Sequence, residues 1–436
     1  MINRRRFILL TGDAVAIAGA FIAVIFIRLN IIGDTIPATS YIGPFSSLLI
    51  LWLITLFIFN FYDIEYIKPN PRNVGILAIA SSINILVGGL VFYFFPQDSL
   101  TPKLTLVLAG VSAFFLLIIW RRLFYKIFAS ISVSRIFVIG SNTSTEHFTE
   151  EVKRNPLVGK VVATFKEINE EEIIKATAQF NSPDIIVAET KELEKLITTT
   201  RNLGVKIMSI EEAYEDMFAK IPTAHLNENT AMQLATKRIS FSNWIFKKIF
   251  DRFVALLVLI ITFPILLLAG LAILIEDGKP IFLPQKRIGK NNKIFFIYKL
   301  RSMKVLAPDG SAEQNGAQWA DVKDPRITFV GRIIRKLHID EIPQMYNILK
   351  GDLALVGPRA ERPEFVENLE KQIPYYFLRH TIRPGFTGWA QIKFHYARTI
   401  ADSERKFEYD LYYIKNRGLI FDIGILFKTI QIIFTH

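Results

Sequence analysis

The sequence predicts a membrane α-helical bundle, a small α/β domain, and a second α/β domain that carries a re-entrant membrane helix. Three observations point to this architecture. Apolar residues make up 51% of the 436 residues, the chain contains five long apolar segments, and strand and helix patterns alternate between the fourth and fifth segments. A chain of this length is expected to form several domains, and we expect their bounds at 1–128, 134–225 and 245–436.

The first domain consists of four apolar segments, each long enough to cross a hydrocarbon core about 30 Å thick. Lys and Arg gather before the first segment, between the second and third, and after the fourth. Cytoplasmic loops are enriched in these residues, so the N-terminus and everything after residue 125 are predicted to face the cytoplasm. The segments are Phe7–Ile27, Phe45–Phe61, Ile76–Phe95 and Leu104–Trp120.

Asp13 lies inside the first of these segments. A lone carboxyl group there costs about 2.5–3.5 kcal/mol on insertion scales. The carboxyl group either makes a polar contact within the bundle or lines a lipid path, or it lies close enough to the interface to reach water. We expect the last of these.

Residues 134–225 alternate between short apolar runs and amphipathic stretches, which predicts a small parallel sheet covered by helices. The strands are expected in SRIFVIG, GKVVATF, PDIIVAET and VKIMSI, and the helices in EEEIIKATAQF and ELEKLITTTRNLG. A dinucleotide-binding turn needs G-x-G-x-x-G, whereas the turn at Gly140 has one glycine. We expect a Rossmann-like spacer or regulatory domain, with nucleotide binding as the alternative.

The fifth apolar run, Phe253–Ile275, is long enough to span a membrane, but Pro264 interrupts it. Proline removes a helical hydrogen bond and kinks or breaks a helix. The hydroxyl of Thr262 is a candidate partner for the freed carbonyl. We expect a re-entrant helix over 250–275 that enters the cytoplasmic leaflet, bends at Pro264 and returns; a fifth crossing is the alternative.

Composition excludes several kinds of site. The chain has no cysteine, which rules out thiolate catalysis and cysteine metal sites, and its six histidines show no metal-ligand spacing. The net charge of +12 is typical of proteins that bind anionic lipid, nucleic acid or a phosphorylated substrate. Because the chain carries membrane segments and no nucleic-acid motif, we expect lipid and phosphate and no nucleic acid.

The last 190 residues contain basic side chains suited to phosphate oxygens, among which Lys299, Arg301, Arg359 and Arg383 are the candidates. A solvated or lipid-facing basic surface is the alternative. Two acids, Asp340 and Glu341, precede a proline that suits a helix start. They either cap that helix or form a catalytic pair that binds Mg²⁺ and attacks a phosphate. Both can face one ion only if the helix begins beyond them.

From about residue 245 onward, a series of motifs closely resembles the bacterial sugar transferase family, the monotopic phosphoglycosyl transferases. The earlier spans and α/β domain resemble its long form, the polyprenyl glycosylphosphotransferases of exopolysaccharide assembly. The motifs are Lys247-Lys248 with Asp251, the apolar stretch with Pro264, QKRIG, KLRSM, DPRIT, DEIPQ, VGPRAERPEF, RPGFTGWAQ and KFEYDLYYIKN.

This resemblance implies transfer of a sugar 1-phosphate from a UDP-sugar to undecaprenyl phosphate at the bacterial inner membrane, with release of UMP. It implies that Asp340 is the nucleophile, that Glu341 tunes it, and that the two acids hold Mg²⁺. Lys299, Arg301 and Arg359 match basic positions expected near the phosphates. Two positions depart from the family pattern: Ala360 replaces a proline that commonly follows the arginine, and Phe263 precedes the helix proline where small members of the family often have serine.

Several alternatives stay open. The apolar C-terminal stretch LIFDIGILFKTIQIIF either lies in the membrane interface or packs into the catalytic core. Rival functions are a scaffold with a decayed site and a nucleotide-sugar oxidoreductase, although an intact acid pair disfavours the first and a single turn glycine disfavours the second. The sugar remains unidentified, and a homodimer is one option for the assembly.

Overall fold

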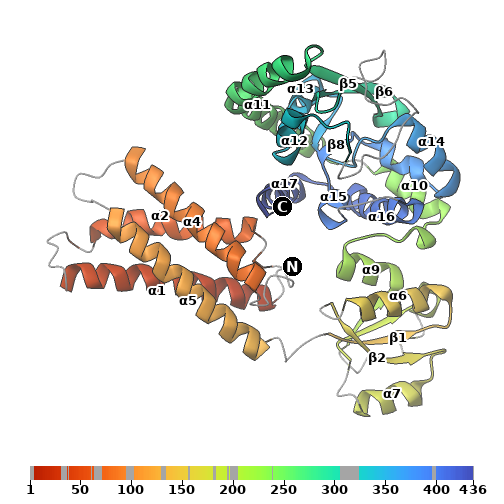
Figure 1. The fold of residues 1–436 in the computed structure, drawn as a ribbon. Helices are drawn as coiled ribbons and strands as arrows, with labels where there is room; N and C mark the ends of the chain where they lie inside the picture. Colours follow the sequence, from red (N-terminus) through yellow and green to blue (C-terminus); the bar gives the residue numbers. More distant parts are fainter. Residues whose placement is uncertain are drawn as a thin grey trace. The chain divides into compact units, whose positions relative to one another are not determined.

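The computed structural model describes residues 4–30, 37, 39–59, 61–62, 71–94, 103–128, 134–155, 158–179, 183–193, 196, 205–237, 239–304, 324–394 and 399–435. The chain forms two compact units, which meet in the sequence between Met208 and Ser209 (Figure 1). The second unit therefore begins well before the expected boundary at residue 245. Residues 209–225 belong with it, because Ile221 packs into its core and the carbonyl of Ala219 accepts a hydrogen bond from Trp389 at 2.9 Å.

The four predicted membrane segments are helices that pack against one another. They share a core that includes Ile17, Trp52, Leu56 and Leu117, and they expose other large apolar side chains on their outer surface. Together with α11 in the second unit, five helices among the described residues are long and apolar enough to cross a membrane. The bundle consists of α1 (Arg4–Asn30), α2 (Thr39–Ile58), α4 (Pro71–Phe94) and α5 (Lys103–Phe128).

Asp13 does not reach water, so our expectation for it was wrong. Its carboxylate is fully buried and lies 2.5 Å from the guanidinium of Arg121, which also donates to the carbonyl of Phe61 at 2.9 Å. A buried charge is tolerated when it is paired, and this pair joins α1 to α5. Asp13 therefore makes the polar contact within the bundle that was the alternative explanation.

The small α/β domain contains a four-stranded sheet in the order β2-β1-β3-β4, in which β1 pairs in parallel with β2 and β3. All four expected strands and the helix at 170–179 are confirmed; most of the expected helix at 192–204 lies outside the described residues. The elements are β1 (Arg135–Ile139), α6 (Thr143–Arg154), β2 (Lys160–Phe165), α7 (Glu170–Gln179), β3 (Ile185–Ala188), η1 (Thr190–Glu192) and β4 (Lys206–Ser209).

The turn after β1 is a poor phosphate site. Gly140 adopts a left-handed φ of +137°, and a Cβ built there would lie 2.8 Å from Oε1 of Glu189. Glu189 follows β3, so its carboxylate sits beside the turn at which a dinucleotide fold places the pyrophosphate. A negative side chain at this point disfavours nucleotide binding at this turn, and the spacer or regulatory role of the domain stays a prediction.

The second unit surrounds short strands with helices. Its hairpin pairs β5 (Phe282–Ile288) with β6 (Ile294–Leu300), and its second sheet pairs β7 (Ala354–Val356) in parallel with β8 (Gly385–Thr387). Its α-helices are α9 (Ile210–Phe218), α10 (Glu228–Thr236), α11 (Phe241–Asp277), α12 (Phe329–Lys336), α13 (Gln344–Lys350), α14 (Pro363–Gln372), α15 (Trp389–Lys393), α16 (Ile400–Asn416) and α17 (Leu419–Thr435), and its 3₁₀ turns are η3 (Thr223–His225), η4 (Lys290–Asn292), η5 (Ile339–Glu341) and η6 (Tyr376–Thr381).

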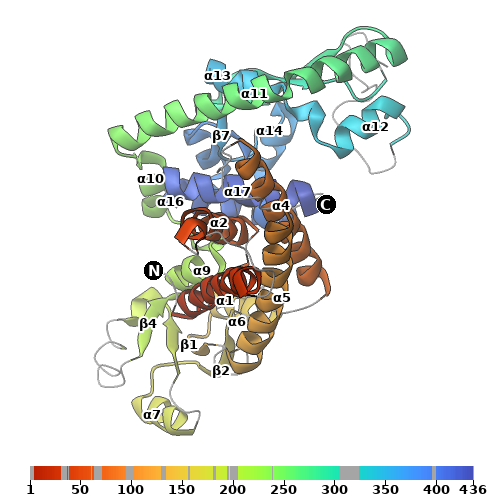
Figure 2. The same cartoon turned by 90° about the vertical axis from the view of Figure 1, so that its left-hand side faces the viewer.

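Helix α11 remains helical through Pro264, so the proline does not end it as a break would (Figure 2). The hydroxyl of Thr262 donates to the carbonyl of Val258 at 2.6 Å. Proline 264 frees a different carbonyl, that of residue 260 one turn before it, so Thr262 is not the partner that we expected. The re-entrant course of this helix stays a prediction.

Both ends of α11 pack against the same unit. Near its start, Lys247 is paired with Asp422, and in its first half Ala255 is fully buried in a cluster with Met345 and Ile348. Near its end, Ile273 packs with Ile334 of α12. Figure 2 shows α11 as one long helix with α13 beside its first half and α12 near its end. Between these contacts, much of its surface is exposed and apolar.

Helix α17 packs into the second unit on one face. Asp422 and Ile425 are buried, and Phe421 contacts Trp389 edge-on at a centroid distance of 5.1 Å. Ile420 and Ile430 on the remaining surface are exposed. Core packing is therefore confirmed for one face, and contact with a membrane interface stays a prediction for the other.

Candidate active site

The two adjacent acids lie in a tight turn before a helix. His338 adopts a left-handed φ of 53°, Asp340 and Glu341 belong to the 3₁₀ turn η5, and α13 begins at Gln344 with Pro343 as its N-cap. The helix thus begins beyond the acids, which is the arrangement that a shared ligand requires. Asp340 is only 9% exposed, whereas an acid that merely caps a helix usually reaches solvent.

Strand β6 supplies the cation that meets this turn. The ammonium of Lys299 lies 2.5 Å from Oε1 of Glu341, and both side chains are largely buried. Arg359 approaches the same oxygen at 3.8 Å and is more exposed. The structure therefore brings together Lys299, Arg359 and the two acids, from three separate parts of the sequence.

The two carboxyl groups have opposite pKa shifts. Burial raises the pKa of Asp340, which Lys299 lowers only in part. Burial also acts to raise the pKa of Glu341, but Lys299 and Arg359 outweigh it and hold that pKa at about 2. Glu341 is thus firmly ionised, while Asp340 is a partly desolvated carboxylate. A desolvated anion beside cations is a chemically reactive arrangement.

Arg301 does not join this group. Its guanidinium is 2% exposed and donates to the carbonyls of Asp277 and Gly278 at 2.8 and 2.7 Å, at the end of α11. It also pairs with the carboxylate of Asp277 at 3.3 Å. The Arg301 side chain therefore holds the end of α11, whereas we expected it near the substrate phosphates.

Arg383 is half-buried before β8, and no contact of its side chain with either acid occurs within the described ranges. Its backbone has a clearer role. A Cβ on Gly357 would lie 2.6 Å from the Arg383 carbonyl, and one on Gly385 would lie 2.0 Å from the amide nitrogen of Gly357. These glycines let the chain segment that carries Arg359 pass directly over the segment that carries Arg383.

The loop that carries Arg359 is held by side chains that donate to its carbonyls. Arg379 donates to the carbonyl of Arg359 at 3.0 Å and is itself paired with Asp410 at 3.0 Å. Arg287 donates to the carbonyl of Ala360 at 3.4 Å. These contacts fix the loop although Ala360 stands where a more rigid proline is common.

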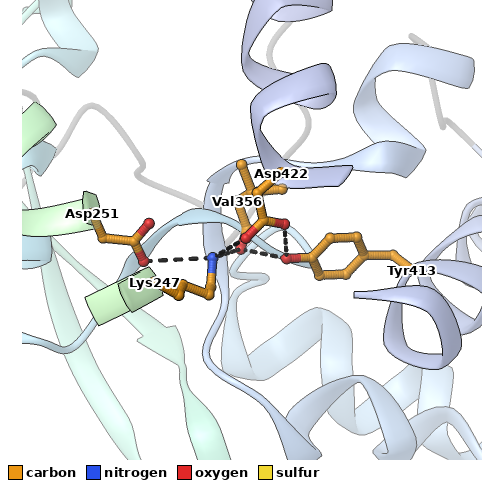
Figure 3. Close-up of polar contacts among 5 residues, drawn as sticks. All are labelled: Lys247, Asp251, Val356, Tyr413 and Asp422. Atoms are coloured by element: carbon orange, nitrogen blue, oxygen red, sulfur yellow. Dashed lines mark hydrogen bonds and ion pairs between the residues drawn. The ribbon is translucent and has the colours of Figure 1, made fainter. Parts of the chain in front are cut away.

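A buried polar network holds the start of the same loop (Figure 3). Tyr413 Oη lies 3.0 Å from the Val356 carbonyl and 2.7 Å from Asp422, while Lys247 Nζ lies 3.4 Å from that carbonyl and 2.5 Å from Asp422. Asp251 is 3.5 Å from the same ammonium. The motif residues Lys247 and Asp251 thus join α11 to α16, α17 and β7 instead of contacting the acid pair.

Sequence patterns did not single out Arg287, Arg379, Asp410 or Asn347. Each is buried or half-buried and bonded to backbone or to a partner distant in sequence. Arg287 and Asp410 lie inside the motifs QKRIG and KFEYDLYYIKN, which gave them no individual role, and Asn347 is a polar residue inside the otherwise apolar helix pattern YNIL.

A family model described as bacterial sugar transferase matches residues 242–436. The chain is 38% identical over 258 residues to the UDP-N-acetylgalactosamine-undecaprenyl-phosphate N-acetylgalactosaminephosphotransferase of Aeromonas hydrophila, covering 58% of this chain and 59% of that protein. It is 31% identical over 240 residues to the UDP-glucose:undecaprenyl-phosphate glucose-1-phosphate transferase of Escherichia coli strain K12, covering 55% of this chain and 51% of that protein.

An uncharacterised sugar transferase of Bacillus subtilis strain 168 is 38% identical over 187 residues, which make up 43% of this chain and 86% of that shorter protein. The chain thus spans little more than half the length of the two long relatives but most of the short one. The match to the family model begins at Ser242, close to the start of α11, and includes the acid pair, Lys299 and the Arg359 loop. The chain belongs to the bacterial sugar transferase family.

Proposed function

We propose that the chain transfers a sugar 1-phosphate from a UDP-sugar to undecaprenyl phosphate, giving the lipid-diphosphate sugar and UMP. The observation that carries this proposal is the buried Asp340 beside an ionised Glu341, with Lys299 and Arg359 around them. Phosphoryl transfer needs charge neutralisation and in-line placement more than acid–base chemistry, and this group supplies the neutralising charges beside a candidate nucleophile. Relatives named for such transfers support the same reaction class.

In the first step, a carboxylate oxygen of Asp340 attacks the β-phosphorus of the donor. The bond between that phosphorus and the oxygen bridging to the α-phosphorus breaks, and UMP leaves with the electron pair. The sugar phosphate is then held on Asp340 as an acyl phosphate. In the second step, a phosphate oxygen of the lipid attacks the same phosphorus, and the Asp340 carboxylate leaves unchanged.

The surrounding charges suit these steps. Glu341, with its pKa held at about 2, stays ionised at every working pH and keeps Lys299 in place. Lys299 and Arg359 offset the negative charge of the diphosphate while Asp340 attacks it. Because burial weakens the hydration of Asp340, its carboxylate is a better nucleophile than one in water.

The acid pair also fits Mg²⁺. Carboxylate oxygens are hard ligands, and Mg²⁺ is usually held by one or two carboxylates together with substrate phosphates. No group of three or more His, Asp or Glu side chains gathers in the part of the chain that the structure describes. Asp340 and Glu341 would hold the ion, which would supply further neutralisation of the donor diphosphate.

The packing of α11 supports a re-entrant course. A helix that crosses a bilayer has its ends on opposite sides, whereas both ends of α11 are bound to one globular unit. Helix α12, next to the acid pair, and its C-cap residue expose Phe329, Ile333 and Leu337 in consecutive turns, with basic residues between them. Such a helix suits the surface of an anionic membrane. We propose that this unit lies on the cytoplasmic face of the inner membrane, where it begins assembly of an exopolysaccharide or related glycan.

The test uses the full chain purified in detergent. It is offered a panel of UDP-sugars with undecaprenyl phosphate and Mg²⁺, and the release of UMP is measured. We expect turnover with at least one sugar, and we expect Asp340→Asn to lower it by more than about 1,000-fold. Near-normal UMP release by a folded Asp340→Asn would overturn the nucleophile role. Absence of transfer with every UDP-sugar would overturn the function.

A further inference from the structure

Asn347 is the most completely buried polar side chain near the acid pair, with an exposed fraction of 0%. It lies in α13, one and a half turns after Glu341 in sequence. Its carboxamide makes two hydrogen bonds, and both go to the backbone of β6. Tyr298 N donates to Oδ1 at 3.2 Å, and Nδ2 donates to the Phe296 carbonyl at 2.7 Å.

This pair of bonds imitates a missing strand. In a parallel ladder, one residue donates to the carbonyl of a residue on the neighbouring strand and accepts from the amide two positions later. The hairpin contains only β5 and β6 among the described elements, so the other edge of β6 has no partner strand there. The Asn347 carboxamide offers one acceptor and one donor to that edge, as a strand residue would.

The bonded segment of β6 ends directly before Lys299. Asn347 accepts a hydrogen bond from the amide of Tyr298, and the next residue, Lys299, donates to Glu341 at 2.5 Å. The main chain of Asn347 is also fixed, because its carbonyl accepts from Gly351 N at 3.0 Å and Asp352 N at 3.1 Å. The strand that carries the cation is thereby tied to the helix that follows the acids.

We propose that Asn347 is a positioning residue for the transfer reaction: its carboxamide sets the distance between β6 and η5–α13, and so places Lys299 against Glu341 and Asp340. The effect on catalysis rests on the proposed function, whereas the effect on Lys299 does not. Neither aspartate nor leucine can replace it. Aspartate cannot donate to the Phe296 carbonyl, and leucine, of similar volume, makes neither bond and leaves two buried backbone groups unpaired.

The first experiment measures Lys299 without using activity. Wild type, Asn347→Leu and Asn347→Asp are treated with an acetylating reagent, and modification of Lys299 is followed by mass spectrometry. We expect Lys299 to react several-fold faster in both variants, because its ammonium is no longer held at Glu341. Ile348→Ala is the matched control: Ile348 neighbours Asn347 in α13, is buried, and shares a core cluster with Ile297 of β6, but its side chain makes no hydrogen bond to that strand. It should lower stability without changing the rate for Lys299.

The second experiment is a double-mutant cycle on UMP release with Lys299→Met. A misplaced catalytic group can cost about 100-fold, so we expect Asn347→Asp to lower kcat by roughly 10–100-fold in the wild-type background. In the Lys299→Met background, the same change should cost less than about 3-fold, because contacting partners couple. Equal losses in both backgrounds, or unchanged Lys299 labelling in both Asn347 variants, would overturn the proposal. If the wild-type protein itself releases no UMP, this counts against the proposed function, whereas the labelling result for Lys299 still tests the role of Asn347.

Discussion

The ammonium of Lys299 lies 2.5 Å from Oε1 of Glu341, and this contact helps to give two neighbouring acids opposite pKa shifts. Glu341 is held ionised, with its pKa at about 2, while burial raises the pKa of Asp340 in the same turn. Lys299 lowers both pKa values, so its removal has a predictable sign for each acid. The pair thus links the charge balance of the site to the pH at which the nucleophile is ionised.

Lys299→Met should lower kcat/KM by at least about 10-fold and should move the acid limb of the pH profile to higher pH. The nucleophile acts as a carboxylate, so activity is lost as pH falls through the pKa of Asp340. Without Lys299 that pKa rises further, and the loss begins at a higher pH. The measurement is UMP release between pH 5 and pH 9. Lys304→Met, an exposed lysine shortly after β6, is the control and should leave the limb in place. An unchanged acid limb in Lys299→Met would contradict the assignment.

Glu341→Gln should lower activity severely and weaken the dependence on Mg²⁺. The amide keeps the size of the side chain but removes the charge that holds Lys299, and it replaces one of the two anionic metal ligands by a neutral oxygen. Titration of Mg²⁺ against UMP release checks this. If wild type and variant alike work equally well without added metal, the assignment of a metal to the pair is wrong.

Much of the fold follows from patterns that depend on local physics. Apolar length predicted the four helices of the bundle and α11, and alternation predicted all four strands of the parallel sheet. A proline after two acids predicted the turn before α13. The boundary between the two units was harder to predict. The sequence of α9 continues the preceding α/β pattern, yet α9 packs against α16, and Glu215 lies 2.5 Å from Lys415.

The site was only half predictable for a related reason. The motifs bring Lys299, Arg359 and the acid pair to notice, and the structure places these together. The motif that contains Lys299 also contains Arg301, but Arg301 lies just after the end of β6 and its side chain binds the end of α11 instead of approaching the acids. Asn347 and Arg379 act through backbone carbonyls that are distant in sequence, and residue type does not reveal such partners.

Arg301→Lys should reduce thermal stability and leave the KM for the UDP-sugar nearly unchanged. Nη2 of the guanidinium donates to two carbonyls at the end of α11, and the shorter lysine side chain, whose ammonium is more strongly hydrated, holds this buried position less well, so we expect a loss of about 1–3 kcal/mol. Thermal unfolding in detergent and a donor titration are the two measurements. A KM raised several-fold at unchanged stability would return Arg301 to the substrate phosphates.

Arg121→Met should reduce the yield of folded protein sharply, because it leaves the buried Asp13 without a partner. Breaking a buried pair from one side costs about 3–5 kcal/mol. The double variant Asp13→Asn with Arg121→Met removes both charges and should recover much of that loss. The measurement is the unfolding of wild type, Arg121→Met and the double variant in detergent. A double variant that is no more stable than Arg121→Met would show that Arg121 acts through the carbonyl of Phe61 instead.

The chain should cross the membrane four times, with α11 entering and leaving on the cytoplasmic side. The natural chain lacks cysteine, so single cysteines can be placed at Ser242 and Lys293, which are exposed on either side of the apolar part of α11. In intact cells, both should resist an impermeant thiol reagent until the membrane is opened. Labelling at position 293 alone in intact cells would demonstrate a fifth crossing.

Pro264→Ala is the companion test of this course. Alanine restores the amide hydrogen that proline lacks, and with it the helical bond to the carbonyl of residue 260, so α11 becomes stiffer in its middle. A stiff helix cannot follow the surface of the second unit at both ends as well, so one set of contacts, at Ala255 or at Ile273, should loosen. Activity should then fall although every catalytic residue is intact, and position 293 should become partly accessible from outside.

Leu267→Ala, which removes an exposed apolar side chain without changing the backbone, is the control. If Pro264→Ala keeps full activity and the wild-type labelling pattern, packing at the two ends sets the course of α11 and the proline does not.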